Sequence, residues 1–117
     1  MRQKRFHIIV DVTDVETSLL TNKTAIKKFL ETLPGAINMQ VLKGPIIAEG
    51  IPENPGVSGV VIIDYSHISI HTFTDCQEAL IDIFSCKPFK QEDAVKAVLD
   101  QFQVAPEKAR VKEVYWG

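Results

Sequence analysis

The segment DYSHISIHTF, residues 64–73, gathers two histidines and two serines into a stretch that otherwise alternates like a β-strand. A period of two places four side chains on one face of that strand: His67, Ser69, His71 and Phe73. The opposite face carries Ser66, Ile68, Ile70 and Thr72. The pattern therefore predicts a strand with one contiguous polar face.

The reactive residues also have plain structural explanations. His67 and His71 could bind a metal, but no Asp or Glu joins them within the run, and Cys86 alone would complete a poor zinc set. A polar sheet face in contact with water explains the same pattern, so we expect no metal site.

Cys86 ends the apolar run IDIFSC, where a cysteine is ordinarily a small buried hydrophobe. Ser58 lies in GVSG, where the glycines suit a tight bend or a close backbone approach.

Patterns on either side of this segment indicate the elements that must position it. Strands are predicted at residues 5–12, 37–50, 60–65, 66–73, 78–86 and 109–116, the second interrupted at Gly44–Pro45. Helices are predicted at 21–33 and 91–102, the first stopped by Pro34–Gly35, and residues 51–59 have the strongest turn composition. The order predicts a single α+β domain over residues 1–117, a two-layer sandwich of a mostly antiparallel sheet with two helices on one face.

Length and composition set the class of protein. The chain has 117 residues, enough for one domain with a core, and its 24% of charged residues and net charge of −2 suggest no nucleic-acid partner. Its apolar runs are too short for a membrane span, and residues 1–12 lack the pattern of a signal peptide. We therefore expect a cytoplasmic protein without a membrane partner, in which Cys76 and Cys86 are free thiols.

The run GVSGVVIIDYSHISIHTF followed by ALIDIFSC resembles the short prokaryotic S-adenosylmethionine decarboxylase proenzymes. The most specific part of the resemblance is SHISIHT followed by DIFSC, in unbroken order. The flanking strand, helix and strand segments are similar to that family in length and order. The resemblance thus extends over the whole chain.

This resemblance implies that the chain makes its own cofactor from Ser66. The serine hydroxyl attacks the preceding carbonyl, the peptide becomes an ester, and β-elimination converts the serine to a pyruvoyl group. Cleavage would fall between Tyr65 and Ser66 and give chains of residues 1–65 and 66–117. The pyruvoyl group then forms a Schiff base with the substrate amine and accepts the electrons left when CO₂ departs.

The resemblance also implies roles for five other side chains. His71 corresponds to the histidine that removes the serine α-proton during processing, a task suited to its pKa near neutrality. Ser58 corresponds to a serine that assists processing, and Cys86 to the cysteine that returns a proton to the substrate. Phe73 and Asp75 correspond to a tryptophan that stacks on adenine and a glutamate that binds the ribose hydroxyls.

Besides Phe73 and Asp75, two further positions depart from the family pattern. Tyr65 stands where a glutamate usually precedes the cleaved serine. Because the attack is on the backbone carbonyl, tyrosine still permits processing. Pro52 stands where a second aromatic residue usually stacks on adenine. That change leaves room for a substrate without an adenine ring.

The spacing of Ser66 and His71 argues for a dimer. Five strand steps place them about 16 Å apart and on opposite faces, so the two residues cannot easily meet within one chain. The resemblance implies a homodimer of αββα layering, with Ser66 and Cys86 of one protomer facing Ser58 and His71 of its partner.

The expected activity is therefore that of a self-processing pyruvoyl-dependent decarboxylase acting on S-adenosylmethionine for the synthesis of spermidine and other polyamines. Two alternatives stay open. One is a decarboxylase of the same fold that acts on arginine or ornithine. The other is an uncleaved, non-catalytic relative with a regulatory function.

Overall fold

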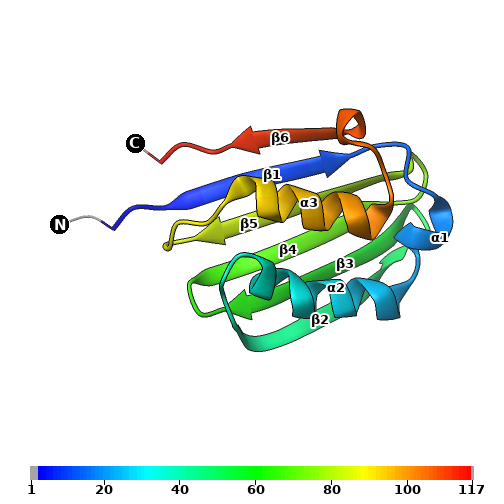
Figure 1. Cartoon of the computed structure of the whole chain (residues 1–117). Helices are drawn as coiled ribbons and strands as arrows, with labels where there is room; N and C mark the ends of the chain where they lie inside the picture. Colours follow the sequence, from blue (N-terminus) through cyan, green and yellow to red (C-terminus); the bar gives the residue numbers. More distant parts are fainter. Residues whose placement is uncertain (1–2, 117) are drawn as a thin grey trace.

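The strands pair into one antiparallel sheet. The computed structural model describes residues 3–116, and within them six strands lie in the order β2-β3-β4-β5-β1-β6. Their bounds are β1 (Phe6–Val12), β2 (Val41–Ile51), β3 (Asn54–Ile63), β4 (Ser66–Phe73), β5 (Glu78–Ser85) and β6 (Ala109–Glu113). Neighbouring strands are antiparallel throughout this order. As Figure 1 shows, the first and last strands of the chain lie side by side at one edge.

Two long helices cover one face of this sheet (Figure 1). They are α2 (Lys23–Ala36) and α3 (Gln91–Phe102), and a short α1 (Thr17–Leu20) and a 3-10 helix (Pro106–Lys108) lie in the connections. Asn22 begins α2, since its side chain accepts a hydrogen bond from the Ala25 amide at 3.0 Å. The predicted α+β sandwich with two helices on one face is confirmed.

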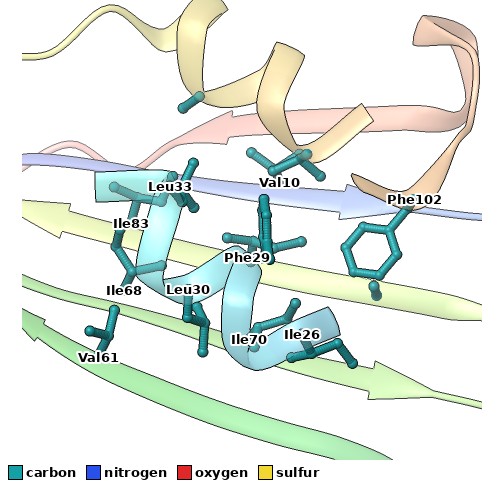
Figure 2. Packing of buried hydrophobic residues seen from close by; sticks show 14 of the residues in the cluster. Val10, Ile26, Phe29, Leu30, Leu33, Val61, Ile68, Ile70, Ile83 and Phe102 are labelled. Carbon is teal, nitrogen blue, oxygen red and sulfur yellow. The ribbon is translucent and has the colours of Figure 1, made fainter. Parts of the chain in front are cut away.

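The core lies between the helices and the sheet face beneath them (Figure 2). The helix-facing positions of β5 alternate with half-buried ones, and Ala79, Ile81 and Ile83 are fully buried. Helix α2 contributes the buried Ile26, Phe29, Leu30 and Leu33. Phe102 of α3 meets Phe29 edge to face, with ring centroids 6.1 Å apart, and this contact joins the two helices above the sheet.

Helices α2 and α3 leave the other face of the sheet largely open. On β4 the side chains of Ile68, Ile70 and Thr72 are buried, whereas His67 and His71 are exposed, which confirms the alternation predicted for this strand. Apolar side chains also reach this outer face: Ile62 of β3 keeps 46% of its surface exposed. The outer face therefore mixes histidines with uncovered aliphatic groups.

The predicted end of the first long helix was wrong by three residues. Helix α2 continues through Pro34 to Ala36 instead of stopping at residue 33. Proline removes one intrahelical hydrogen bond, but the Pro34 ring is buried in the core. Its carbonyl accepts hydrogen bonds from the amides of Ile37 and Met39 at 3.1 and 2.8 Å, so the loss is offset where the helix ends.

The bounds of the next two strands also differ from the prediction. β2 begins at Val41, because residues 37–40 turn away from α2 with Asn38 at a φ of 60°. The expected interruption at Gly44–Pro45 is present as a shift in the register of β2 with β3. Residues 51–59 were predicted as turns, yet Asn54–Gly59 already belong to β3, which is paired on both sides. Pairing with β2 at Asn54 and Val57, and with β4 from Ser58 onward, outweighs the local turn preference of Pro55 and Gly56.

The last strand is shorter than predicted. β6 ends at Glu113, although the Val114 amide still donates to the His7 carbonyl at 2.8 Å. The short α1 and the 3-10 helix lie in segments where no element was predicted. No helix within residues 3–116 combines the length and the apolar character that crossing a bilayer requires.

Candidate active site

The Tyr65–Ser66 bond lies in the tight turn between β3 and β4. Ser66 is the first residue of β4 and pairs with Ile63 of β3 on one side and Ser85 of β5 on the other. Its φ of 145° is unusual for a residue with a side chain, which indicates local backbone strain. The Tyr65 carbonyl accepts a hydrogen bond from the Cys86 amide at 2.9 Å. The bond predicted to be cleaved thus has a fixed carbonyl and a strained residue after it.

Cys86 follows directly after β5 and is half-buried. The register of β4 with β5 places Ser66 opposite Ser85, so the cysteine backbone lies next to the predicted cleavage site. The structure therefore brings the backbones of Tyr65, Ser66 and Cys86 together.

Ser58 and His71 form a second group. They face each other directly across β3 and β4, and the Ser58 Oγ lies 2.8 Å from the His71 Nδ1. Gly56 permits this register, since a Cβ at that position would lie 1.9 Å from the Thr72 carbonyl oxygen. Spacing along the sequence gave no sign that these two side chains would be hydrogen-bonded.

The two groups do not meet within one chain. Ser66 and His71 occupy positions five residues apart on β4, with different partners on each neighbouring strand. Strand alternation puts them on opposite faces. A site that uses both residues needs a further contribution from outside the protomer.

Of the two predicted substrate-binding residues, Phe73 lies near the second group. The Phe73 ring stacks near the His71 ring, with centroids 6.5 Å apart and an interplanar angle of 30°. Asp75 is exposed in the turn between β4 and β5. Pro52 is exposed in the turn between β2 and β3 and lines an open cavity of about 360 Å³ with Gly56 and Thr74. Phe73 is therefore close to His71, whereas Asp75 and Pro52 lie in turns at the sheet end.

The other polar groups of the outer face make separate contacts. His67 stacks on Phe84, with ring centroids 5.5 Å apart, and His7 Nε2 lies 2.8 Å from the Asp82 carboxylate. Within residues 3–116, no three side chains of His, Cys, Asp or Glu cluster in a way that could hold a metal ion. His67 and His71 therefore gain no third ligand there.

The two cysteines differ in their surroundings, although both are free thiols. Partial desolvation and then the nearby Glu78 carboxylate raise the pKa of the Cys76 thiol. A raised pKa lowers the fraction of reactive thiolate at neutral pH. Cys86, beside the Tyr65 carbonyl, is the better placed of the two for chemistry at Ser66.

Sequence reasoning missed two residues that shape this end of the sheet, Ser85 and Lys87. The buried Ser85 hydroxyl accepts from the Lys87 amide at 2.9 Å and donates to the Lys87 carbonyl at 2.8 Å. Serine often bonds backbone groups two residues on, and that preference was the available signal. In the sequence it was hidden inside the apolar run IDIFSC.

Comparison with known proteins gives a consistent match. The model of the S-adenosylmethionine decarboxylase family matches residues 6–115. The S-adenosylmethionine decarboxylase proenzyme of Thermococcus kodakarensis is 33% identical over 113 residues, covering 96% of this chain and 76% of that protein. The proenzyme of Methanococcus maripaludis is 31% identical over 119 residues, covering 100% of this chain and 93% of that protein.

A solved structure shares the fold. The crystal structure of the adenosylmethionine decarboxylase from Aquifex aeolicus superposes with a TM-score of 0.79 at 24% identity, covering 97% of this chain and 91% of that one.

Proposed function

Because this chain belongs to the S-adenosylmethionine decarboxylase family, we propose that it is a self-processing, pyruvoyl-dependent decarboxylase of S-adenosylmethionine. The observation that carries the proposal is the arrangement at the β3–β4 turn. There the Cys86 amide holds the Tyr65 carbonyl at 2.9 Å, directly before the strained Ser66. The decarboxylated product would supply aminopropyl groups for the synthesis of spermidine.

Self-cleavage begins with attack of the Ser66 Oγ on the Tyr65 carbonyl carbon. A C–O bond forms, the C–N bond breaks, and the hydroxyl proton passes to the new amine, which leaves an ester. The Cys86 amide donates to the carbonyl oxygen and so stabilises the negative charge that develops on it. The fixed carbonyl and the strained φ of Ser66 both favour this step.

Release of the upstream chain needs a base. Loss of the Ser66 α-proton and rupture of the ester C–O bond give a Tyr65 carboxylate and a dehydroalanine, which water converts to a pyruvoyl group and ammonia. His71 is our candidate base. When its Nδ1–H donates to the Ser58 Oγ, its Nε2 is the free basic nitrogen, so Ser58 orients the ring for proton removal.

The residues around Ser66 fit a pyruvoyl group at that position. A carbonyl of this kind supplies the electron sink that decarboxylation of an amino acid requires. Cys86 would return a proton to the substrate carbon, and its half-buried position beside Ser66 suits that role. Phe73 would stack on adenine and Asp75 would bind the ribose hydroxyls.

We infer a homodimer with two composite sites, each built from Ser66 and Cys86 of one protomer and Ser58 and His71 of its partner. The separation of Ser66 from His71 along β4 supports this arrangement. So does the open outer face, where Val60 and Ile62 leave 36% and 46% of their surfaces exposed. An isologous contact through this face would bury these groups and give αββα layering.

Pro52 favours a second substrate class. It is exposed in the β2–β3 turn and has no aromatic ring to stack on adenine. Arginine and ornithine need no such contact. A catalytically inactive, uncleaved relative is the remaining alternative, and it predicts no CO₂ from any of the three substrates.

The proposal is tested by incubating the purified protein with S-adenosylmethionine, arginine or ornithine and measuring CO₂ release. We expect release from S-adenosylmethionine and none in the Ser66→Ala variant. CO₂ release from arginine or ornithine instead would change the proposed substrate but retain the proposed reaction type. A protein that releases no CO₂ from any of them would contradict the proposed activity.

A further inference from the structure

The side chain of Lys87 reaches across the predicted cleavage site. Its ammonium group lies 5.0 Å from the centroid of the Tyr65 ring and donates a hydrogen bond to the Asn38 carbonyl at 2.9 Å. These residues belong to three connections, α2–β2, β3–β4 and β5–α3, which lie at the same end of the sheet (Figure 1). One half-buried lysine therefore joins three turns.

The turn that carries Lys87 is itself held in place. The Ser85 hydroxyl is fully buried and bonds both the amide and the carbonyl of Lys87, at 2.9 and 2.8 Å. The residue between them, Cys86, donates its amide to the Tyr65 carbonyl at 2.9 Å. The same turn thus fixes the Tyr65 carbonyl through Cys86 and the Tyr65 ring through Lys87.

The chemistry of the contact suits a tyrosine. A lysine ammonium within about 6 Å of an aromatic centroid is attracted to the negative face of the ring. The Asn38 carbonyl satisfies one ammonium donor and limits where the flexible side chain can lie. Because 39% of the Tyr65 surface is exposed, this contact with Lys87 restrains a residue that the core does not enclose.

We propose that Lys87 is a positioning residue for self-cleavage. By holding the Tyr65 ring it keeps the Tyr65 carbonyl in the orientation that the Ser66 hydroxyl attacks. This inference rests on the proposed cleavage between Tyr65 and Ser66. Lys87 is not proposed to contact the reacting atoms. The effect of Lys87 is on the rate at which the precursor is cleaved.

The test follows precursor cleavage over time after cell-free synthesis of the full chain, with fragments quantified by intact mass. Lys87→Met should slow cleavage by roughly three- to tenfold, the range expected for a partly exposed cation–π contact. Lys87→Arg keeps the cation and should restore most of the rate. The same Lys→Met change at Lys96, an exposed residue on α3, is the matched control and should leave the rate unchanged.

A double-mutant cycle separates positioning from a general effect on the fold. Tyr65→Leu removes the aromatic ring but keeps the attacked carbonyl, and it should be slowed as much as Lys87→Met. Combining Tyr65→Leu with Lys87→Met should add little to either change, because both remove the same contact. The inference would be overturned if the two rate reductions multiplied in the double variant, or if Lys87→Met were cleaved at the wild-type rate. Either result would leave the proposed function standing. A wild-type chain that is never cleaved would contradict both.

Discussion

At the scale of single residues, Ser66 combines three features: a hydroxyl, a φ of 145° and a preceding carbonyl held by the Cys86 amide. The hydroxyl was evident from the sequence, and the resemblance to the decarboxylase family implied its role. The unusual φ of Ser66 and the held carbonyl depend on the turn between β3 and β4 and on the end of β5. Together they would favour the proposed attack on the Tyr65 carbonyl.

The roles of Ser66 and Cys86 can be separated by substitution. Ser66→Ala removes the attacking oxygen and should abolish cleavage. Cys86→Ala keeps the backbone amide that holds the Tyr65 carbonyl, so it should spare much of the cleavage but reduce CO₂ release. Intact mass and a CO₂ assay measure the two effects. An uncleaved Cys86→Ala variant beside a cleaved Ser66→Ala variant would mean that the roles are wrongly assigned.

Of the site, the sequence supplied the residues but not their contacts. The hydrogen bond between Ser58 and His71 needs β3 and β4 in register, and the link from Tyr65 to Cys86 needs β5 beside the β3–β4 turn. Lys87 could not be found from local pattern, since its partners Asn38 and Tyr65 lie 49 and 22 residues away in the chain. These are tertiary relations, and one sequence carries no direct signal for them.

At the scale of elements, the long periodic segments were predictable because their buried faces repeat. The alternation predicted for β4 and the bounds predicted for α3 both agree with the structure. Two of the errors lie at Pro34 and at residues 54–59, where glycine and proline indicated breaks. Burial of Pro34 and pairing of β3 with its neighbours outweighed these local preferences.

The close approach of β3 to β4 at Gly56 gives a prediction at this scale. Gly56→Ala would place a Cβ 1.9 Å from the Thr72 carbonyl oxygen, so the strands must separate. We expect a loss of unfolding free energy of about 3–5 kcal/mol and a slower cleavage, because Ser58 and His71 are then displaced. Chemical denaturation in the Ser66→Ala background measures the first effect on an uncut chain.

Gly35→Ala in α2 is the matched control, because beyond its chain neighbours and its own helix backbone no atom lies within 4 Å of the added Cβ. It should be neutral or stabilise the protein by up to about 1 kcal/mol, as alanine favours helix over glycine. Equal destabilisation by both alanines would contradict the account of Gly56.

At the scale of the whole molecule, the sheet has one face packed on helices and one open. The open face carries His71, Ser58 and uncovered aliphatic side chains, while Ser66 lies at the end of β4, in the β3–β4 turn. In the proposed homodimer, a second copy of the chain would cover the apolar groups and supply its His71 at the sheet end where Ser66 lies.

Mixing two inactive variants tests this composite arrangement. Ser66→Ala lacks the nucleophile and His71→Ala lacks the base, so neither should be cleaved alone. In a mixed dimer, the Ser66 of the His71→Ala chain meets the intact His71 of its partner, and that chain alone should be cut. Co-expression with distinguishable tags and intact mass identify the cleaved chain. Absence of cleavage in isolated mixed dimers would indicate that each site is built within one protomer.

The central claim, cleavage between Tyr65 and Ser66, is tested most directly by intact mass spectrometry of the purified protein. We expect two species, residues 1–65 with a free carboxylate and residues 66–117 with a pyruvoyl group in place of Ser66. A single stable species with the mass of all 117 residues would contradict it.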